Sequence, residues 1–307
     1  MKISVQDGGI VEFFGVEKGY KMIAEAGFEG IDWNINNDAP GSHIRNGTIC
    51  GNTIFEKPLD EVLAYYKPKI DEIKKNGLEI SQAHAPFPSW TPEHPEVLDE
   101  MIEIQKRCIE LCDAVGCKYL VIHGVSLAEF DSENTPESIE AVNIKLYESL
   151  IPTLLKHNVT VCLENLFSSK GCLIEGCCSN PHEAVKYIDT LNQKAGREVF
   201  GLCLDTGHLS LLRKNFRSYI KTVGNRIKAL HVHDNDAVTD AHLMPFTGVI
   251  DWNYFCNSMK EIGYDGDLSF ETFAQARRVE KFDPELVPEL LRWICLNGKS
   301  FKKKIEA

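Results

Sequence analysis

The sequence lacks long apolar segments. Residues 1–19 contain no apolar run of the length that a signal peptide needs. No later stretch approaches the roughly 18 to 20 consecutive apolar residues of a membrane span. We therefore expect a soluble, cytoplasmic protein that has no membrane partner.

Dense basic segments are also scarce. The formal net charge is −12, and the densest basic run is Lys302, Lys303 and Lys304 near the C-terminus. A chain with this balance repels polyanions unless its cations gather on one face. The charge therefore argues against a general nucleic-acid partner.

Two spacing signatures are missing as well. Cys172, Cys177 and Cys178 could bind a soft metal but lack the paired C-x2-C spacing of structural zinc sites, and Gly8 and Gly9 lack the G-x-G-x-x-G spacing of a nucleotide-binding turn. The chain has eleven cysteines, and an odd number in an oxidising compartment would leave one reactive thiol. The cysteines therefore favour a reducing compartment and, for the most part, small core positions.

What the sequence does contain is a repeat of short β-rich runs separated by longer helical ones. The predicted strands are residues 2–7, 29–35, 79–85, 119–125, 160–166, 200–206, 227–235 and 267–272. Strands separated by helices are parallel neighbours joined by right-handed crossovers, and their Val, Ile and Leu content indicates that both faces are covered. The pattern predicts an α/β fold, a (β/α)8 TIM barrel that forms one domain over residues 1–307. A doubly wound sheet is the alternative.

Ionisable side chains stand at the C-terminal ends of the last six predicted strands. They are His84, His123, Glu164, Asp205 with His208, His231 with His233, and Glu271. Active sites of parallel barrels are built at these ends. Three carboxylates at one mouth repel each other unless a cation or protons neutralise them. We therefore expect one divalent metal ion there.

The predicted ligands are Glu164, Asp205, His233 and Glu271. Three carboxylates and an imidazole suit Mn²⁺, our first choice, or Zn²⁺, Mg²⁺ or Co²⁺ rather than a soft metal. His231 and His233 point to the same side of the seventh strand, so either fits by position. His233 is nearer the mouth, and His231 is interpreted as a deeper partner.

Nine segments together resemble a known family. They are GFEGIDWNI (27–35), HAPF (84–87), VIHG (121–124), CLENL (162–166), LDTGH (204–208), LHVHDN (230–235), DAHL (240–243), GVIDW (248–252) and SFET (269–272). With them the chain resembles the sugar isomerase/epimerase group of the xylose-isomerase-like barrels, a superfamily that includes the zinc-dependent endonuclease IV.

The resemblance to ketose 3-epimerases implies roles for individual residues. It implies the same four metal ligands and a substrate contact at His208. The metal stabilises an enediolate, and Glu164 and Glu271 act as an acid/base pair on opposite faces of one carbon. Loss of a β-hydroxyl from the same enediolate would instead give dehydration, as in the related inosose dehydratases.

The chain departs from the epimerase pattern in two places. The residues after His233 are DNDAVTDAH, without the Arg that those enzymes commonly have there, and HLMPFTGVIDW lacks their Pro-Gly. The sugar-phosphate contacts of the family are therefore not carried over. Candidate substrate contacts are the aromatic residues Trp33, Phe87 and Trp90 and the cationic residues Arg277 and Arg278.

Two other functions stay open. His84, His123, His208, Asp240 and His242 resemble the additional ligands of the three-zinc cluster of endonuclease IV, which implies a phosphodiesterase, although the acidic charge opposes DNA binding. A non-catalytic sugar-binding barrel would need a lost catalytic carboxylate, and both are present. Asp240 and His242, spaced i, i+2, bind a second cation with His208 or form a hydrogen-bonded lid contact. Related barrels often pair, so a homo-oligomer is also an expectation.

Overall fold

The computed structural model describes residues 1–126, 134–169 and 172–307. The chain divides into two compact units, each assembled from separate segments. Unit 1 contains Met1–Trp33, Pro68–Ser81 and Cys203–Ala307, and unit 2 contains Asn34–Lys67 and Gln82–Leu202.

Eight strands form one sheet, in the order β10-β1-β2-β3-β4-β5-β8-β9. They are β1 (Ile3–Gln6), β2 (Gly30–Asn34), β3 (Glu79–His84), β4 (Tyr119–Val121), β5 (Thr160–Glu164), β8 (Phe200–Asp205), β9 (Ile227–His231) and β10 (Leu268–Phe270). The registers of β1 with β2 and β10, and of β4 with β3 and β5, are parallel. Each predicted strand segment contains one of these strands, and the predicted (β/α)8 TIM-barrel class is confirmed.

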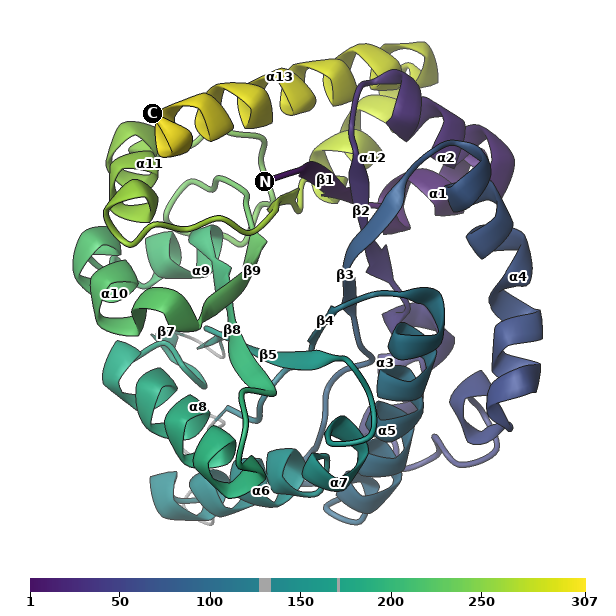
Figure 1. Cartoon of the computed structure of the whole chain (residues 1–307), viewed down its shortest axis with the longest axis vertical. Helices are drawn as coiled ribbons and strands as arrows, with labels where there is room; N and C mark the ends of the chain where they lie inside the picture. The colour runs from purple at the N-terminus through teal and green to yellow at the C-terminus, as the bar shows by residue number, and fades with distance from the viewer. Residues whose placement is uncertain (127–133, 170–171) are drawn as a thin grey trace. The chain divides into compact units, whose positions relative to one another are not determined.

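Unit 1 carries the helices of the two ends of the chain. They are α1 (Gly8–Phe14), α2 (Val16–Glu25), α9 (Thr206–Leu211), α10 (Phe216–Val223), η3 (Gly224–Arg226), α11 (Trp252–Glu261), α12 (Phe273–Phe282), η4 (Pro284–Leu286) and α13 (Val287–Glu306). The long α13, yellow in Figure 1, runs along α11 and α12. Trp252 of α11 stacks on Phe301 of α13, with ring centroids 5.1 Å apart, and both are buried. Aromatic packing therefore fixes the C-terminal helix of this unit.

Unit 2 carries η1 (Asn36–Asp38), α3 (Gly41–Arg45), η2 (Ile54–Glu56), α5 (Val97–Val115), α6 (Pro136–Glu148), α7 (Ile151–Leu154) and α8 (Pro181–Ala195). Thr135 caps α6, because its side chain accepts from the Ser138 N–H in a capping box. Gly116 and Gly196 end α5 and α8 in the left-handed conformation, as their positions in the sequence predict. An antiparallel hairpin of β6 (Phe167–Ser169) and β7 (Leu173–Glu175) was not expected from the sequence.

Four elements contain residues of both units. Strands β2, β3 and β8 and helix α4 (Leu59–Lys75) each begin in one unit and end in the other. Separately folded domains are joined by exposed linkers rather than through the interior of a strand. We therefore keep the single domain over residues 1–307 as a proposal.

Several candidate residues lie just beyond the strands, and not within them as predicted. Strand β4 ends two residues before His123, and β9 ends two residues before His233. Backbone bonds continue past β9, because Val232 N–H donates to the Ser269 carbonyl at 2.8 Å and Glu271 N–H donates to the Val232 carbonyl at 3.1 Å. The backbone that carries His233 and Glu271 is thus held by this pairing.

No helix within the described residues is both long and apolar enough to cross a membrane.

Candidate metal centre

In unit 1, the end of β8 brings a carboxylate to an imidazole. Asp205 is the last residue of β8 and caps α9, where its Oδ1 accepts the His208 backbone N–H at 2.7 Å. Its other oxygen, Oδ2, lies 3.0 Å from Nε2 of His233. Both side chains are fully buried. The capping bond fixes the carboxylate, so that one oxygen is directed at His233.

The two residues after Asp205 hold His233 in place. The Thr206 hydroxyl donates to the His233 carbonyl at 2.8 Å and accepts its N–H at 3.0 Å. Gly207 has no side chain, and a Cβ there would lie 1.9 Å from Cε1 of His233. The DTGH motif therefore contributes two positioning features that we did not recognise in the sequence.

The loop after β9 adds a second histidine. Asp234 and Leu243 form an isolated antiparallel bridge, and the buried Asp234 carboxylate accepts the Trp252 indole N–H at 3.0 Å. This pairing places the His242 ring on His233, with centroids 4.2 Å apart and an interplanar angle of 17°. His242 takes a positive φ of 43°. The loop is thus anchored at its base while it presents an imidazole.

Asp240 lies among three histidines. Its Oδ2 is 3.0 Å from Nε2 of His242 and 3.7 Å from Nε2 of His208. Its Oδ1 is 3.9 Å from Nε2 of His233 and is buried without a hydrogen-bond partner within the described residues. Burial by itself raises the pKa of Asp240, but the hydrogen bonds and charges of His208 and His242 outweigh burial and hold that pKa well below its usual range.

The pKa of His242 shifts in the opposite direction. Burial lowers its pKa, but the negative charges of Glu271 and Asp240 outweigh burial and raise the pKa to about 9. Its Nδ1 lies 3.1 Å from the Glu271 carbonyl oxygen. The loop histidine is therefore cationic at neutral pH in this arrangement.

Glu271 follows β10 directly and is 7% exposed. Its Oε1 accepts the Gln6 side-chain N–H at 2.7 Å. Its Oε2 lies 3.6 Å from Nδ1 of both His231 and His242. Sequence reasoning missed Gln6, although a polar residue in an apolar strand was an available signal.

His231 approaches the same carboxylate as His233. Its Nδ1 is 4.0 Å from Oδ2 of Asp205, the same oxygen that His233 approaches, so the two histidines do point to one side. Its Nε2 is 3.1 Å from Oδ2 of the fully buried Asp32 on β2. Asp32 is a second residue that sequence reasoning missed.

Unit 2 contains a cluster of two histidines and a glutamate. His84, the last residue of β3, has Nδ1 at 3.0 Å from the Ala85 carbonyl and Nε2 at 3.0 Å from Nε2 of His123. Oε2 of Glu164, the last residue of β5, lies 2.9 Å from Nε2 of His123 and 3.9 Å from Nε2 of His84. Because the Ala85 carbonyl can only accept, Nδ1 of His84 carries the proton and Nε2 is the potential ligand atom.

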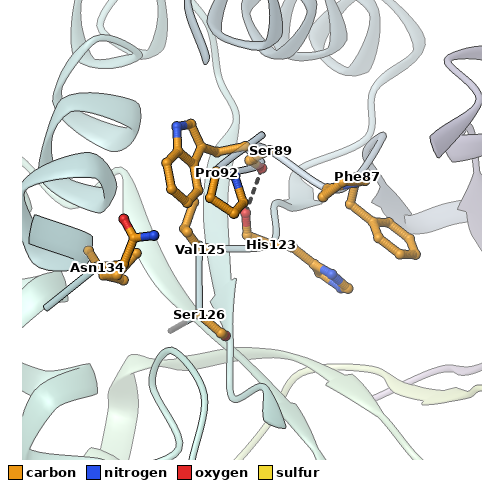
Figure 2. Close-up of a pocket in the computed structure, with 11 residues that line it drawn as sticks. Phe87, Ser89, Pro92, His123, Val125, Ser126 and Asn134 are labelled. Carbon is orange, nitrogen blue, oxygen red and sulfur yellow. Dashed lines mark hydrogen bonds between the residues drawn. The ribbon is translucent and has the colours of Figure 1, made fainter. Parts of the chain in front are cut away.

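A pocket of about 200 Å³ adjoins His123 in unit 2. Figure 2 shows the Ser89 hydroxyl directed at the His123 carbonyl, to which it donates at 2.7 Å. Trp90 and Phe87 contribute to the lining, and the Phe87 and His123 ring centroids are 4.3 Å apart. Among the described residues that line this pocket there is no Lys or Arg.

Two predicted substrate contacts, Trp33 and Arg277, have protein partners in unit 1. Trp33 is 0% exposed and interacts with Tyr20 of α2, which favours a packing role over substrate binding. Arg277 of α12 is half exposed, pairs with Glu12 at 3.0 Å and lies over the Phe273 ring. The structure therefore gives Arg277 a protein partner in place of the expected substrate anion.

The donor atoms fit a divalent cation. Three groups whose members belong to one unit have ligand atoms within 4.8 Å of one another: Asp205, His208 and His233; His233, His242 and Glu271; and His84, His123 and Glu164. Oxygen and imidazole donors suit Mn²⁺ or Zn²⁺, and the unpartnered Oδ1 of Asp240 is a further acceptor. Cys177 and Cys178 have sulfur atoms 3.7 Å apart, but among the described residues no such group includes a cysteine.

Enzymes that are parallel barrels have their active sites at the C-terminal ends of the strands, and ionisable groups stand at those ends in this chain. The chain belongs to the xylose isomerase-like TIM barrel family, whose model matches residues 21–296. This confirms the resemblance drawn from the sequence motifs.

Relatives and solved structures agree with the family. The y4fM protein of Sinorhizobium fredii is 26% identical over 270 residues, which cover 84% of this chain and 81% of y4fM. D-psicose 3-epimerase of Enterocloster bolteae is 23% identical over 204 residues, which cover 65% of this chain and 64% of the enzyme. The crystal structure of the IOLI protein with a bound zinc atom has a TM-score of 0.68 at 17% identity, covering 99% of this chain and 98% of that one.

Proposed function

We propose that the protein is a metal-dependent isomerase or epimerase that acts on a sugar or sugar-like keto substrate through an enediolate. The observation that carries the proposal is the convergence of Asp205, His233 and Glu271, with their imidazole neighbours, in unit 1. One divalent ion, Mn²⁺ before Zn²⁺, Mg²⁺ or Co²⁺, would be held there, with Glu164 as its fourth ligand.

The strand order supports the role of Glu164. Strand β5 neighbours β8 in the sheet, and Glu164 and Asp205 are the last residues of those strands. In a parallel barrel the strand ends meet at one mouth. The ketose 3-epimerases that the motifs resemble use the same four positions.

The protein side chains would divide the chemistry. A divalent cation bound there would polarise the substrate carbonyl and acidify the adjacent C–H bond. Glu164 would remove or return the carbon-bound proton on one face, and Glu271 would do so on the other. His208, whose backbone is fixed by Asp205, would donate a hydrogen bond to a substrate hydroxyl.

The pocket beside His123 supports an uncharged substrate. Phe87 and Trp90 offer aromatic surface for the C–H face of a sugar, and the described lining provides no cation for a phosphate. D-psicose 3-epimerase is a relative whose name gives a sugar of this kind. Loss of a β-hydroxyl in place of reprotonation would make the enzyme a dehydratase, and the same residues would serve.

A second candidate function is favoured by the unit 2 cluster. His84, His123 and Glu164 form a possible ligand group without any residue of unit 1. A single-metal epimerase does not require this second group. His84 and His123, together with His208, Asp240 and His242, are the positions that resemble the additional ligands of the three-zinc phosphodiesterases. The net charge of −12 opposes a nucleic-acid substrate.

The cysteines support the cytoplasmic expectation. All eleven are free thiols, which persist in a reducing compartment.

The decisive experiment is exchange of substrate carbon-bound protons with solvent deuterium, read by NMR across ketoses, inososes and keto-glycosides after loading with Mn²⁺ or Zn²⁺. Glu164→Gln and Glu271→Gln should each abolish exchange, because each removes a candidate base. Glu103→Gln, an exposed carboxylate of α5 that pairs with Lys106, is the matched control and should exchange at the wild-type rate. Full exchange in either site variant, with metal retained, would overturn the proposal. Cleavage of a phosphodiester without any exchange would favour the second candidate.

A further inference from the structure

Glu271 receives its orientation from residues of three other strands. We propose that Gln6, His231 and Asp32 form a positioning layer beneath the metal ligands, which leaves Glu271 to act through Oε2 alone. The inference rests on the proposed function, because it assumes that Glu271 is a ligand and base.

The Gln6 amide occupies one oxygen of Glu271. Its side-chain nitrogen donates to Oε1 at 2.7 Å, and both residues are buried. An ionised carboxylate only accepts hydrogen bonds, so the amide must present its N–H and not its carbonyl. Oε1 is therefore engaged by the protein, and Oε2 is the oxygen that faces the histidines.

His231 lies between the two carboxylates of unit 1. Its Nδ1 is 3.6 Å from Oε2 of Glu271 and 4.0 Å from Oδ2 of Asp205. One nitrogen of the ring faces both carboxylates, which as like charges would otherwise repel each other. Its position therefore sets the separation of two proposed ligands.

Asp32 fixes the other side of that ring. Oδ2 of Asp32 lies 3.1 Å from Nε2 of His231, and both side chains are fully buried. Asp32 is also the register partner of Gln6 across β1 and β2. Gln6, which contacts Glu271, and Asp32, which contacts His231, thus start from adjacent positions on adjacent strands.

The composition of this layer is itself unusual. Barrel interiors are dominated by branched apolar side chains, and a buried carboxylate costs free energy that apolar packing would avoid. Gln6 on β1 and His231 on β9 nevertheless approach the Glu271 carboxylate, and Asp32 on β2 approaches His231. A role in orienting Glu271 accounts for this polar layer.

The test compares variants in metal binding as well as in turnover. Gln6→Met keeps the volume and removes the donor, Asp32→Asn keeps an acceptor for His231, and Asp32→Ala removes it. Ser4→Ala is the matched control, because Ser4 lies on β1 with the same orientation as Gln6 but its hydroxyl donates to the Leu268 carbonyl. Mn²⁺ and Zn²⁺ dissociation constants are measured by calorimetry on chelator-treated protein, with circular dichroism as the check on folding.

We expect Gln6→Met and Asp32→Ala to weaken metal binding by about 10-fold to 100-fold, the usual range for partners of metal ligands. The rate of proton exchange, kcat, should fall by a similar factor while KM changes little, and Asp32→Asn should keep most of both. Ser4→Ala should match the wild type. If Asp32→Ala does not fold, Gln6→Met and Asp32→Asn carry the comparison.

Wild-type affinity and kcat in folded Gln6→Met would overturn this inference and leave the proposed function intact. Equal losses in Ser4→Ala would also overturn it, because the effect would then be general to the core. Absence of metal binding and of exchange in the wild type would instead be a failure of the proposed function.

Discussion

Gly207 provides the space that His233 occupies. A Cβ at position 207 would lie 1.9 Å from Cε1 and 2.6 Å from Nε2 of that imidazole. The glycine has an ordinary backbone conformation, so the steric contact alone determines what a substitution would do. Gly207 therefore controls the placement of a proposed ligand that lies just beyond the neighbouring strand, β9.

Gly207→Ala should displace the His233 ring and weaken Mn²⁺ binding by at least about 10-fold, with an overpacking cost of roughly 1 to 3 kcal/mol. Calorimetric metal titration and thermal unfolding would measure the two effects. Gly196→Ala is the control: Gly196 has a φ of 72° with open space around it, so it should lower the melting temperature without changing metal affinity. Unchanged affinity in Gly207→Ala would show that His233 is not a ligand.

Chelation should remove activity and leave the fold. The buried core of the chain consists largely of apolar side chains, so burial rather than an ion supplies most of the stability. Far-ultraviolet circular dichroism before and after treatment with EDTA, followed by restoration of proton exchange with Mn²⁺, would test this. Unfolding at room temperature after chelation would show that the ion is structural.

Metal stoichiometry separates the two candidate functions. We expect one tightly bound ion in the wild type and also in the double variant Asp240→Ala/His242→Ala, since Asp240 and His242 bond each other at 3.0 Å as a loop contact would. Elemental analysis at saturating Zn²⁺ and Mn²⁺ gives the count. A second equivalent that disappears in the double variant would contradict the single-metal proposal and strengthen the phosphodiesterase alternative.

The stability of chelated protein should depend on His242. The pKa of His242 is raised from 6.5 to about 9 in the folded protein. Its contribution to the free energy of unfolding, on the order of 3 kcal/mol, is therefore complete below pH 6.5 and is lost as pH rises through 9. The melting temperature of the wild type should therefore fall more steeply over this pH window than the melting temperature of His242→Asn. Parallel curves for the two proteins would mean that the Glu271 and Asp240 charges do not act on His242 as the structure indicates.

The sequence alone predicts the strands, the fold class and the main ligand candidates, because these depend on local pattern. Apolar runs bounded by helix signals define the strands, and a carboxylate such as Glu164 or Asp205 at the end of a run is visible without knowledge of its neighbours. The predicted strand ends are approximate, because His123 and His233 lie beyond the strands that were expected to contain them. The β6–β7 hairpin left no comparable signal.

Only the tertiary structure decides which polar residues meet. Gln6 and Glu271 are 265 positions apart, and their contact depends on the register of β1 with β10. The stacking of His242 on His233 depends on a loop held by Asp234. Trp33 is fully buried, which the presence of an aromatic residue in an apolar strand does not reveal. Side-chain direction alternates along a strand, so a single step of register decides whether a residue serves the core or the site.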